Sequence, residues 1–202
     1  MVLPAAGIRD REVNALLDAA VGIQNLLDRF GWRYCIIGGI ALLRWGDARL
    51  TRDVDLALLT GFGREDEFTI PLLDAGYVGR IPDAAAFARR NRVLLVTAPN
   101  GVPVDISLAA LPFEARAVER ATHFEFAPGC SLKTCSAEDL LVFKLFAFRP
   151  QDLVDVESVA SKWGRSLDWA YVEENLAPLA ELKETPAIMQ KLAGLQRTHE
   201  RS

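Results

Sequence analysis

The stretch from Arg33 to Leu59 reads RYCIIGGIALLRWGDARLTRDVDLALL, and its pattern decides the fold. Residues 33–37 are mostly apolar and predict a short buried strand. The pair Gly38-Gly39 ends this strand, and residues 40–45 return to a helical pattern. The stretch therefore predicts a strand, a glycine turn and the N-terminus of a helix.

Two aspartates open the next strand, which is predicted over residues 53–59 and starts after 13 residues that follow the glycine pair. Asp53 and Asp55 share one face of it, because alternate side chains of a strand point the same way. Asp105 lies between apolar neighbours in another predicted strand. Ionised carboxylates in apolar strands are costly unless something compensates their charge. We therefore expect the three acids to meet at one edge of a sheet and to bind Mg²⁺, with two ions expected.

The glycine turn offers a complementary feature. Glycines let a backbone approach a ligand closely, and the amides at a helix N-terminus attract phosphate. Gly38 and Gly39 therefore predict a phosphate cradle upstream of the acidic strand. A simple strand-to-helix turn is the alternative interpretation of the glycine pair alone.

The rest of the chain mixes strands and helices, which predicts an α+β fold. A long amphipathic helix is expected over residues 10–30, with Gly31 as its stop, and a capping box at Ser136 and Asp139 opens a later one. Further helices are predicted at residues 64–76, 83–91 and 137–148, from about residue 151, and as two helices within 168–198. Further strands are predicted at 92–97 and 102–107, which a turn joins, and as two strands within 122–134.

Composition limits the class of protein. The chain has 202 residues and 22.2 kDa, which suits one domain or one domain with a small satellite. With 50% apolar and 25% charged residues, it is a globular rather than a disordered sequence. A formal net charge of −4 does not recruit nucleic acid unaided. Three sparse cysteines and the lack of a signal or membrane-span pattern predict a reduced, cytoplasmic protein with no membrane partner.

These motifs carry a resemblance. Gly38-Gly39, the Asp53-x-Asp55 pair and the later strand acid Asp105 resemble the signature of the DNA polymerase β-like nucleotidyltransferase superfamily. Within it, the segments RLTRDVD (49–55), SAEDLLVFK (136–144) and FRPQDLVD (148–155) are similar to the AbiEii-type nucleotidyltransferases of toxin–antitoxin systems.

The resemblance implies a minimal nucleotidyltransferase fold: a mixed, mainly antiparallel sheet flanked by helices, followed by a C-terminal helical part. We accordingly expect a core with its N-terminal helix over residues 1–135 and the helical part over 136–202. The implied reaction moves a nucleoside monophosphate from a nucleoside triphosphate to an acceptor hydroxyl and releases pyrophosphate. An antitoxin protein is an implied partner.

The same resemblance assigns roles to residues. Asp53 and Asp55 would bind both metal ions, while Asp105 would bind the catalytic ion and help to deprotonate the acceptor. Gly38 and Gly39 would hold the triphosphate. Ile40 departs from the pattern, because many members have serine after a glycine there. The backbone amides must then hold the phosphates without a hydroxyl.

Lys144 and Asp152 occupy the places of a lysine and an aspartate that belong to the active site in the toxin-like members. We expect Lys144 to contact phosphate of the nucleotide; the alternative is a side chain whose stem covers the core. For Asp152 or the nearby Asp155 the alternative is a favourable place in the first turn of a helix. Arg52 is expected to bind the nucleotide, although Arg49 and Arg52 can also pair with the aspartates.

The acceptor is left open by the sequence: an RNA end, a protein hydroxyl or a small molecule such as an antibiotic all suit the chemistry. An arginine cluster at residues 89–92, with Arg80 upstream, either contacts an RNA backbone or forms a solvated helix end. Two functions compete with a transferase, namely a nucleotide-sensing module of the same fold without catalysis, and a phosphodiesterase.

Overall fold

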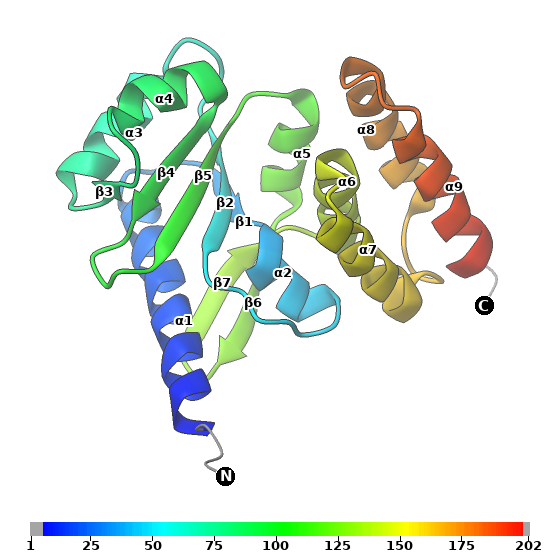
Figure 1. The fold of residues 1–202 in the computed structure, drawn as a ribbon, viewed down its shortest axis with the longest axis horizontal. Coiled ribbons are helices and arrows are strands. Elements are labelled where there is room, and N and C mark those ends of the chain that lie inside the picture. Colours follow the sequence, from blue (N-terminus) through cyan, green and yellow to red (C-terminus); the bar gives the residue numbers. More distant parts are fainter. Residues whose placement is uncertain (1–5, 200–202) are drawn as a thin grey trace.

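The computed structural model describes residues 6–199 and the side chains of residues 13–199 (Figure 1). It contains helices and strands interleaved along the chain. The helices are α1 (Ala6–Arg29), α2 (Gly38–Trp45), α3 (Glu65–Asp74), α4 (Ala84–Asn91), α5 (Pro112–Arg120), α6 (Ala137–Ala147), α7 (Pro150–Trp163), α8 (Trp169–Leu182) and α9 (Ala187–His199). The strands are β1 (Tyr34–Ile36), β2 (Val54–Leu59), β3 (Val78–Gly79), β4 (Val93–Thr97), β5 (Pro103–Ala109), β6 (Thr122–Ala127) and β7 (Cys130–Thr134).

All seven strands form one sheet in the order β3-β4-β5-β2-β1-β7-β6. Strand β2 pairs in parallel with β5, and β1 pairs in parallel with β7, while the other four pairings are antiparallel. The predicted α+β class with a mixed, mainly antiparallel sheet is confirmed. The register that matters most aligns Asp55 with Asp105 across β2 and β5.

Helices cover both faces of this sheet (Figure 1). Helices α1, α3 and α4 pack on one face, where Leu56 and Leu58 of β2 point. Helices α2 and α5 to α9 lie over the other face, where Ala57 of β2 points. Asp53, Asp55 and Ala57 are alternate residues along the chain, so their side chains point to the same face of the sheet. This is the face covered by α2 and α5 to α9. The boundary proposed near residue 135 stays a prediction.

Two elements escaped the sequence reasoning. Strand β3 has two residues, which is too short for a periodic signal. Helix α5 has an N-terminus fixed by Glu114, whose carboxylate accepts hydrogen bonds from the backbone N–H groups of Ala110 and Leu111. Proline at its first position already has a helical φ angle. No helix among residues 6–199 has both the length and the apolar character needed to span a membrane.

Candidate active site

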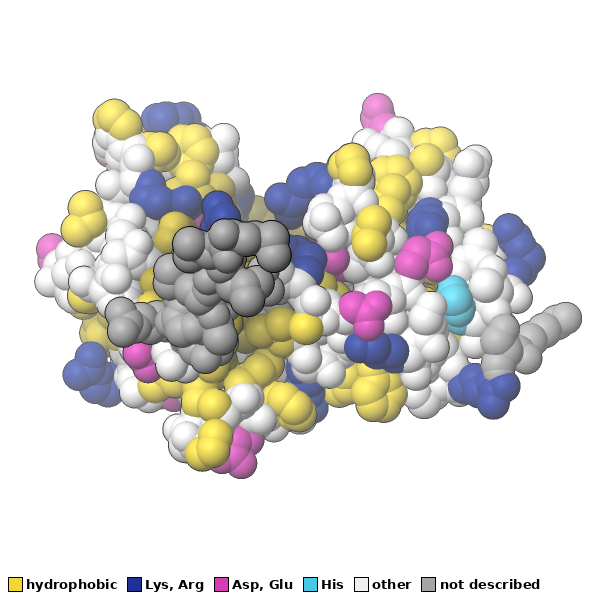
Figure 2. Space-filling model, turned by 60° about the horizontal axis from the view of Figure 1, so that its bottom comes forward, with side chains coloured by type: hydrophobic (Ala, Val, Ile, Leu, Met, Phe, Trp, Pro, Cys, Tyr) yellow, Lys and Arg dark blue, Asp and Glu magenta, His cyan; other side chains and the backbone are white. Residues whose placement is uncertain are grey.

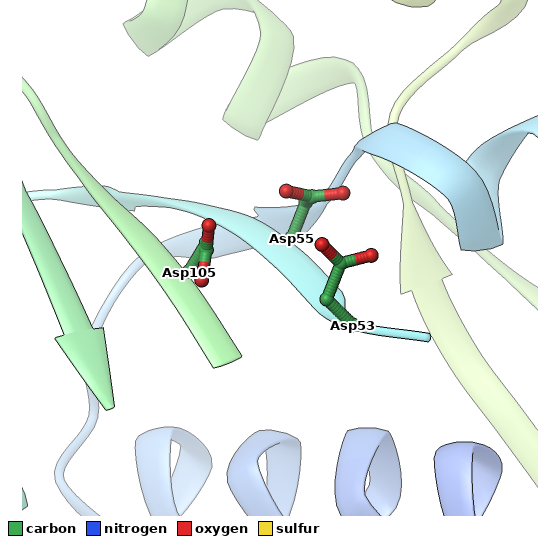
Figure 3. Close-up of side chains that lie close together, drawn as sticks. All are labelled: Asp53, Asp55 and Asp105. Atoms are coloured by element: carbon green, nitrogen blue, oxygen red, sulfur yellow. The ribbon is translucent and has the colours of Figure 1, made fainter. Parts of the chain in front are cut away.

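Three carboxylates meet on one face of the sheet (Figure 3). Asp53 directly precedes β2, Asp55 lies within it, and Asp105 lies on the neighbouring β5. One carboxylate oxygen from each residue lies within 4.8 Å of the others. The structure therefore brings together the acids that the alternating pattern of the sequence singled out. Their role as metal ligands remains a proposal.

Burial and mutual repulsion make the ionised forms of two of these carboxylates unfavourable. Burial, and then repulsion from Asp53 and Asp105, raises the pKa of Asp55 to about 6. A hydrogen bond from the Gly39 backbone and the charge of Lys144 oppose this rise without cancelling it. Burial also raises the pKa of Asp105, although Arg80 pulls that pKa down. The cluster thus holds more negative charge than the protein groups around it compensate.

The glycine pair lies directly against the acids. Gly38 has a φ of +60°, which favours glycine, and a Cβ there would collide with the carboxylate of Asp55. A Cβ at Gly39 would collide with the side chain of Thr51. A backbone hydrogen bond of 2.9 Å from Ile37 N–H to the Asp55 carbonyl joins the turn to β2. Both glycines are therefore required by close approach at the N-terminus of α2.

A cavity of about 390 Å³ contains this cluster. Ligand pockets in proteins are commonly of this size. Its lining combines acidic, basic, small and apolar side chains from the sheet, from α2 and from the α6–α7 region. The lining residues are Ile37, Gly38, Gly39, Arg49, Thr51, Asp53, Asp55, Asp105, Ser107, Phe143, Lys144, Ala147, Arg149, Gln151 and Asp152.

Lys144 lies in the cavity wall, held between two acids of α7. Its Nζ atom lies 3.1 Å from Asp152 Oδ1 and 2.7 Å from Asp155 Oδ2. The lysine side chain is only 6% exposed. The predicted pair Lys144 and Asp152 is therefore in contact at the cavity, and the proposed phosphate contact of Lys144 stays a prediction.

Asp155 binds Arg49 as well as Lys144. Arg49 binds it with two fork-like hydrogen bonds of 3.0 Å, from Nε to Oδ1 and from Nη2 to Oδ2. Burial opposes ionisation of Asp155, but hydrogen bonds from Arg49, Lys144 and Gln151 outweigh it and lower its pKa. Asp152 lines the cavity, whereas Asp155 is absent from its lining. Asp155 therefore positions Lys144 and Arg49.

The arginines are distributed differently from the expectation. Arg52 is exposed and is not among the lining residues, so its role in binding nucleotide stays a prediction, while Arg49 and Arg149 do line the cavity. Arg80 forms an ion pair with Asp105. From the arginine cluster of α4, Arg89 pairs with an acid of α3 at 2.7 Å. Sequence reasoning missed Arg80 at the site, since only the strand register brings it there.

No family model matches the chain, and no curated protein matches it. Solved structures do. An antigenic nucleotidyltransferase-like protein from Paracoccidioides brasiliensis matches with a TM-score of 0.51 and 19% identity, over 89% of this chain and 93% of that chain. The antibiotic-resistance factor ANT(2'')-Ia matches with a TM-score of 0.50 and 16% identity, over 98% of this chain and 100% of that chain. At such identities the likeness concerns the arrangement of the backbone, and it shows that this chain has the nucleotidyltransferase fold.

Proposed function

We propose that this protein is a magnesium-dependent nucleotidyltransferase that moves a nucleoside monophosphate from a nucleoside triphosphate to an acceptor hydroxyl and releases pyrophosphate. The observation that carries the proposal is the convergence of Asp53, Asp55 and Asp105, within 4.8 Å, beside a glycine turn that opens a helix. The shared nucleotidyltransferase fold supports it.

The donor set suits the proposed metal. Three carboxylates supply the hard oxygen ligands that magnesium prefers. The raised pKa of Asp55, caused by burial and by its two acidic neighbours, marks negative charge that a cation would relieve. Divalent ions held by these residues, two in our proposal, would neutralise phosphate charge and activate the attacking oxygen.

The surrounding residues would position the substrates. Gly38 and Gly39 form the N-terminus of α2, where the backbone N–H groups and the helix dipole favour the anionic triphosphate. Asp105 is proposed to accept the proton of the acceptor hydroxyl. Lys144 is proposed to contact phosphate from the cavity wall, where two acids hold its ammonium group in place.

The acceptor is the finer part of the proposal. The segments similar to AbiEii-type enzymes favour an RNA end, a toxin role and an antitoxin partner. Arg49 and Arg149 add positive charge to the cavity wall, and Figure 2 shows Lys and Arg side chains on both sides of a notch between two lobes. A small-molecule acceptor is the second candidate, because a chain of the same fold and similar length is an antibiotic-resistance factor. A protein hydroxyl is the third candidate acceptor.

The test is a transfer assay. Purified protein is incubated with Mg²⁺ and each of the four α-³²P-labelled ribonucleoside triphosphates, together with total RNA, a protein lysate or a panel of antibiotics. Label on an acceptor, with pyrophosphate released, would support the proposal and name the acceptor. Label released as free monophosphate would instead indicate a phosphodiesterase, and tight binding without turnover would indicate a sensor.

Variants and a chelator make the assay specific to the site. Asp53→Asn and Asp105→Asn should abolish transfer while circular dichroism shows a retained fold. Exposed Asp74, at the end of α3, provides the matched control, and Asp74→Asn should leave transfer unchanged. EDTA should stop the reaction. Full activity of Asp53→Asn, or in EDTA, would refute the assignment of the site.

A further inference from the structure

Arg80 lies at one end of a row of residues that runs across strands β4, β5 and β2. It directly follows β3, and its backbone N–H donates a 3.0 Å hydrogen bond to the carbonyl of Leu95 on β4. Leu95 lies opposite Asp105 on β5, and Asp105 lies opposite Asp55 on β2. The sheet therefore aligns a guanidinium with the acidic cluster from the side that faces away from the glycine turn.

The side chain of Arg80 reaches over this row and forms an ion pair with Asp105 through Nη2 and Oδ1. Among the residues whose side chains are described, 13–199, Asp105 is the only one of the three clustered acids with an ion pair. Each side chain of the pair is 31% exposed. Asp105 is therefore accessible, but Arg80 already binds one of its two carboxylate oxygens.

Such a pair is easily exchanged. Exposed ion pairs contribute little because water screens the charges and both side chains lose freedom. Arg80 also directly follows β3, the two-residue strand at one edge of the sheet. A divalent cation offers the same carboxylate two positive charges, and carboxylate oxygens are ligands that Mg²⁺ prefers. Arg80 and a cation thus compete for one ligand.

We propose that Arg80 is a displaceable counter-ion of Asp105, which it holds until a divalent cation takes its place. This inference rests on the proposed function, since it assumes that the three acids bind metal. Arg80 then raises the cation concentration at which the third ligand becomes available. The site assembles completely only when the cation outcompetes the arginine.

The test measures metal binding without nucleotide and without turnover. Mn²⁺ is titrated into wild-type protein, Arg80→Ala and Arg80→Gln, and free Mn²⁺ is read by electron paramagnetic resonance. Because an exposed ion pair is weak, both variants should bind Mn²⁺ about two- to fivefold more tightly than the wild type. Arg89→Ala is the matched control, since it removes one arginine from an ion pair on α4 without touching the acids. It should leave the affinity unchanged.

The outcomes separate this inference from the proposed function. Wild-type or weaker affinity in both Arg80 variants would overturn the inference, as would equal tightening in Arg89→Ala, which would indicate a general effect of charge. Asp53→Asn locates the ion: if it loses Mn²⁺ while the Arg80 variants do not tighten, the metal site stands and only the counter-ion role fails. If the wild type binds no Mn²⁺, both fail together.

Discussion

Removing the charge of Asp55 should stabilise the folded protein in the absence of divalent cations. Burial and the two neighbouring acids raise its pKa from 3.8 to about 6. Between these values the folded protein holds a proton that the unfolded chain has released, so the free energy of unfolding falls as pH rises through this range. The penalty is complete above pH 6 and amounts to about 2–3 kcal/mol. Asp55→Asn, which has no charge to bury, should escape it.

The assay is urea denaturation of wild type and Asp55→Asn in EDTA at pH 4 and pH 8. The variant should be more stable by about 2–3 kcal/mol at pH 8 and nearly equal to the wild type at pH 4. Asp74→Asn, at an exposed site, should change stability by less than about 0.5 kcal/mol at either pH. A less stable Asp55→Asn at pH 8, or a difference that does not change with pH, would refute the electrostatic reasoning. Saturating Mg²⁺ should reverse the order, because only the wild type keeps all three acids.

Two further substitutions test the walls of the cavity. Gly38→Ala should lower the free energy of unfolding by about 1–3 kcal/mol more than Gly61→Ala, because both glycines have positive φ but only at Gly38 would a Cβ collide with a carboxylate. Equal losses in chemical denaturation would contradict this. Lys144→Met should cost about 1.5–3 kcal/mol at pH 7, since it removes a cation that two buried carboxylates share and leaves each with one arginine partner. A loss below about 1 kcal/mol at pH 7 would show that the acids have sufficient partners without it.

Much of the fold could be predicted because its signals are local. Residues 10–30 repeat apolar side chains at helical spacing, and Gly31, with a φ of +67°, follows the resulting helix. The hydroxyl of Ser136 accepts the predicted capping hydrogen bond at the start of α6. Helix α5 was missed although Pro112 and Glu114 are good N-terminal signals, because its nine residues bury only three apolar side chains, at helical spacing but over little more than one turn.

The residues of the site could likewise be predicted only where their signals are local in the sequence. Asp53, Asp55 and Asp105 stood out because charges in apolar strands need an explanation, and parallel pairing of β2 with β5 brings them together. Contacts set by tertiary packing gave no such signal. Arg49 and Asp155 are 106 residues apart in sequence, and nothing local predicts that they form an ion pair. Arg80 reaches Asp105 only through the registers of three strands.

Asp155 has a mechanical consequence for the cavity. It belongs to α7 but binds Arg49, which precedes β2, and Lys144 of α6. A hinge motion that moved α7 away from the sheet would separate the carboxylate of Asp155, which is only 2% exposed, from the guanidinium of Arg49. That separation is costly for buried groups, so we expect both walls to move as one rigid body. Substrates should then enter past the rim at Arg149, whose side chain is 77% exposed, without a hinge opening between the layers.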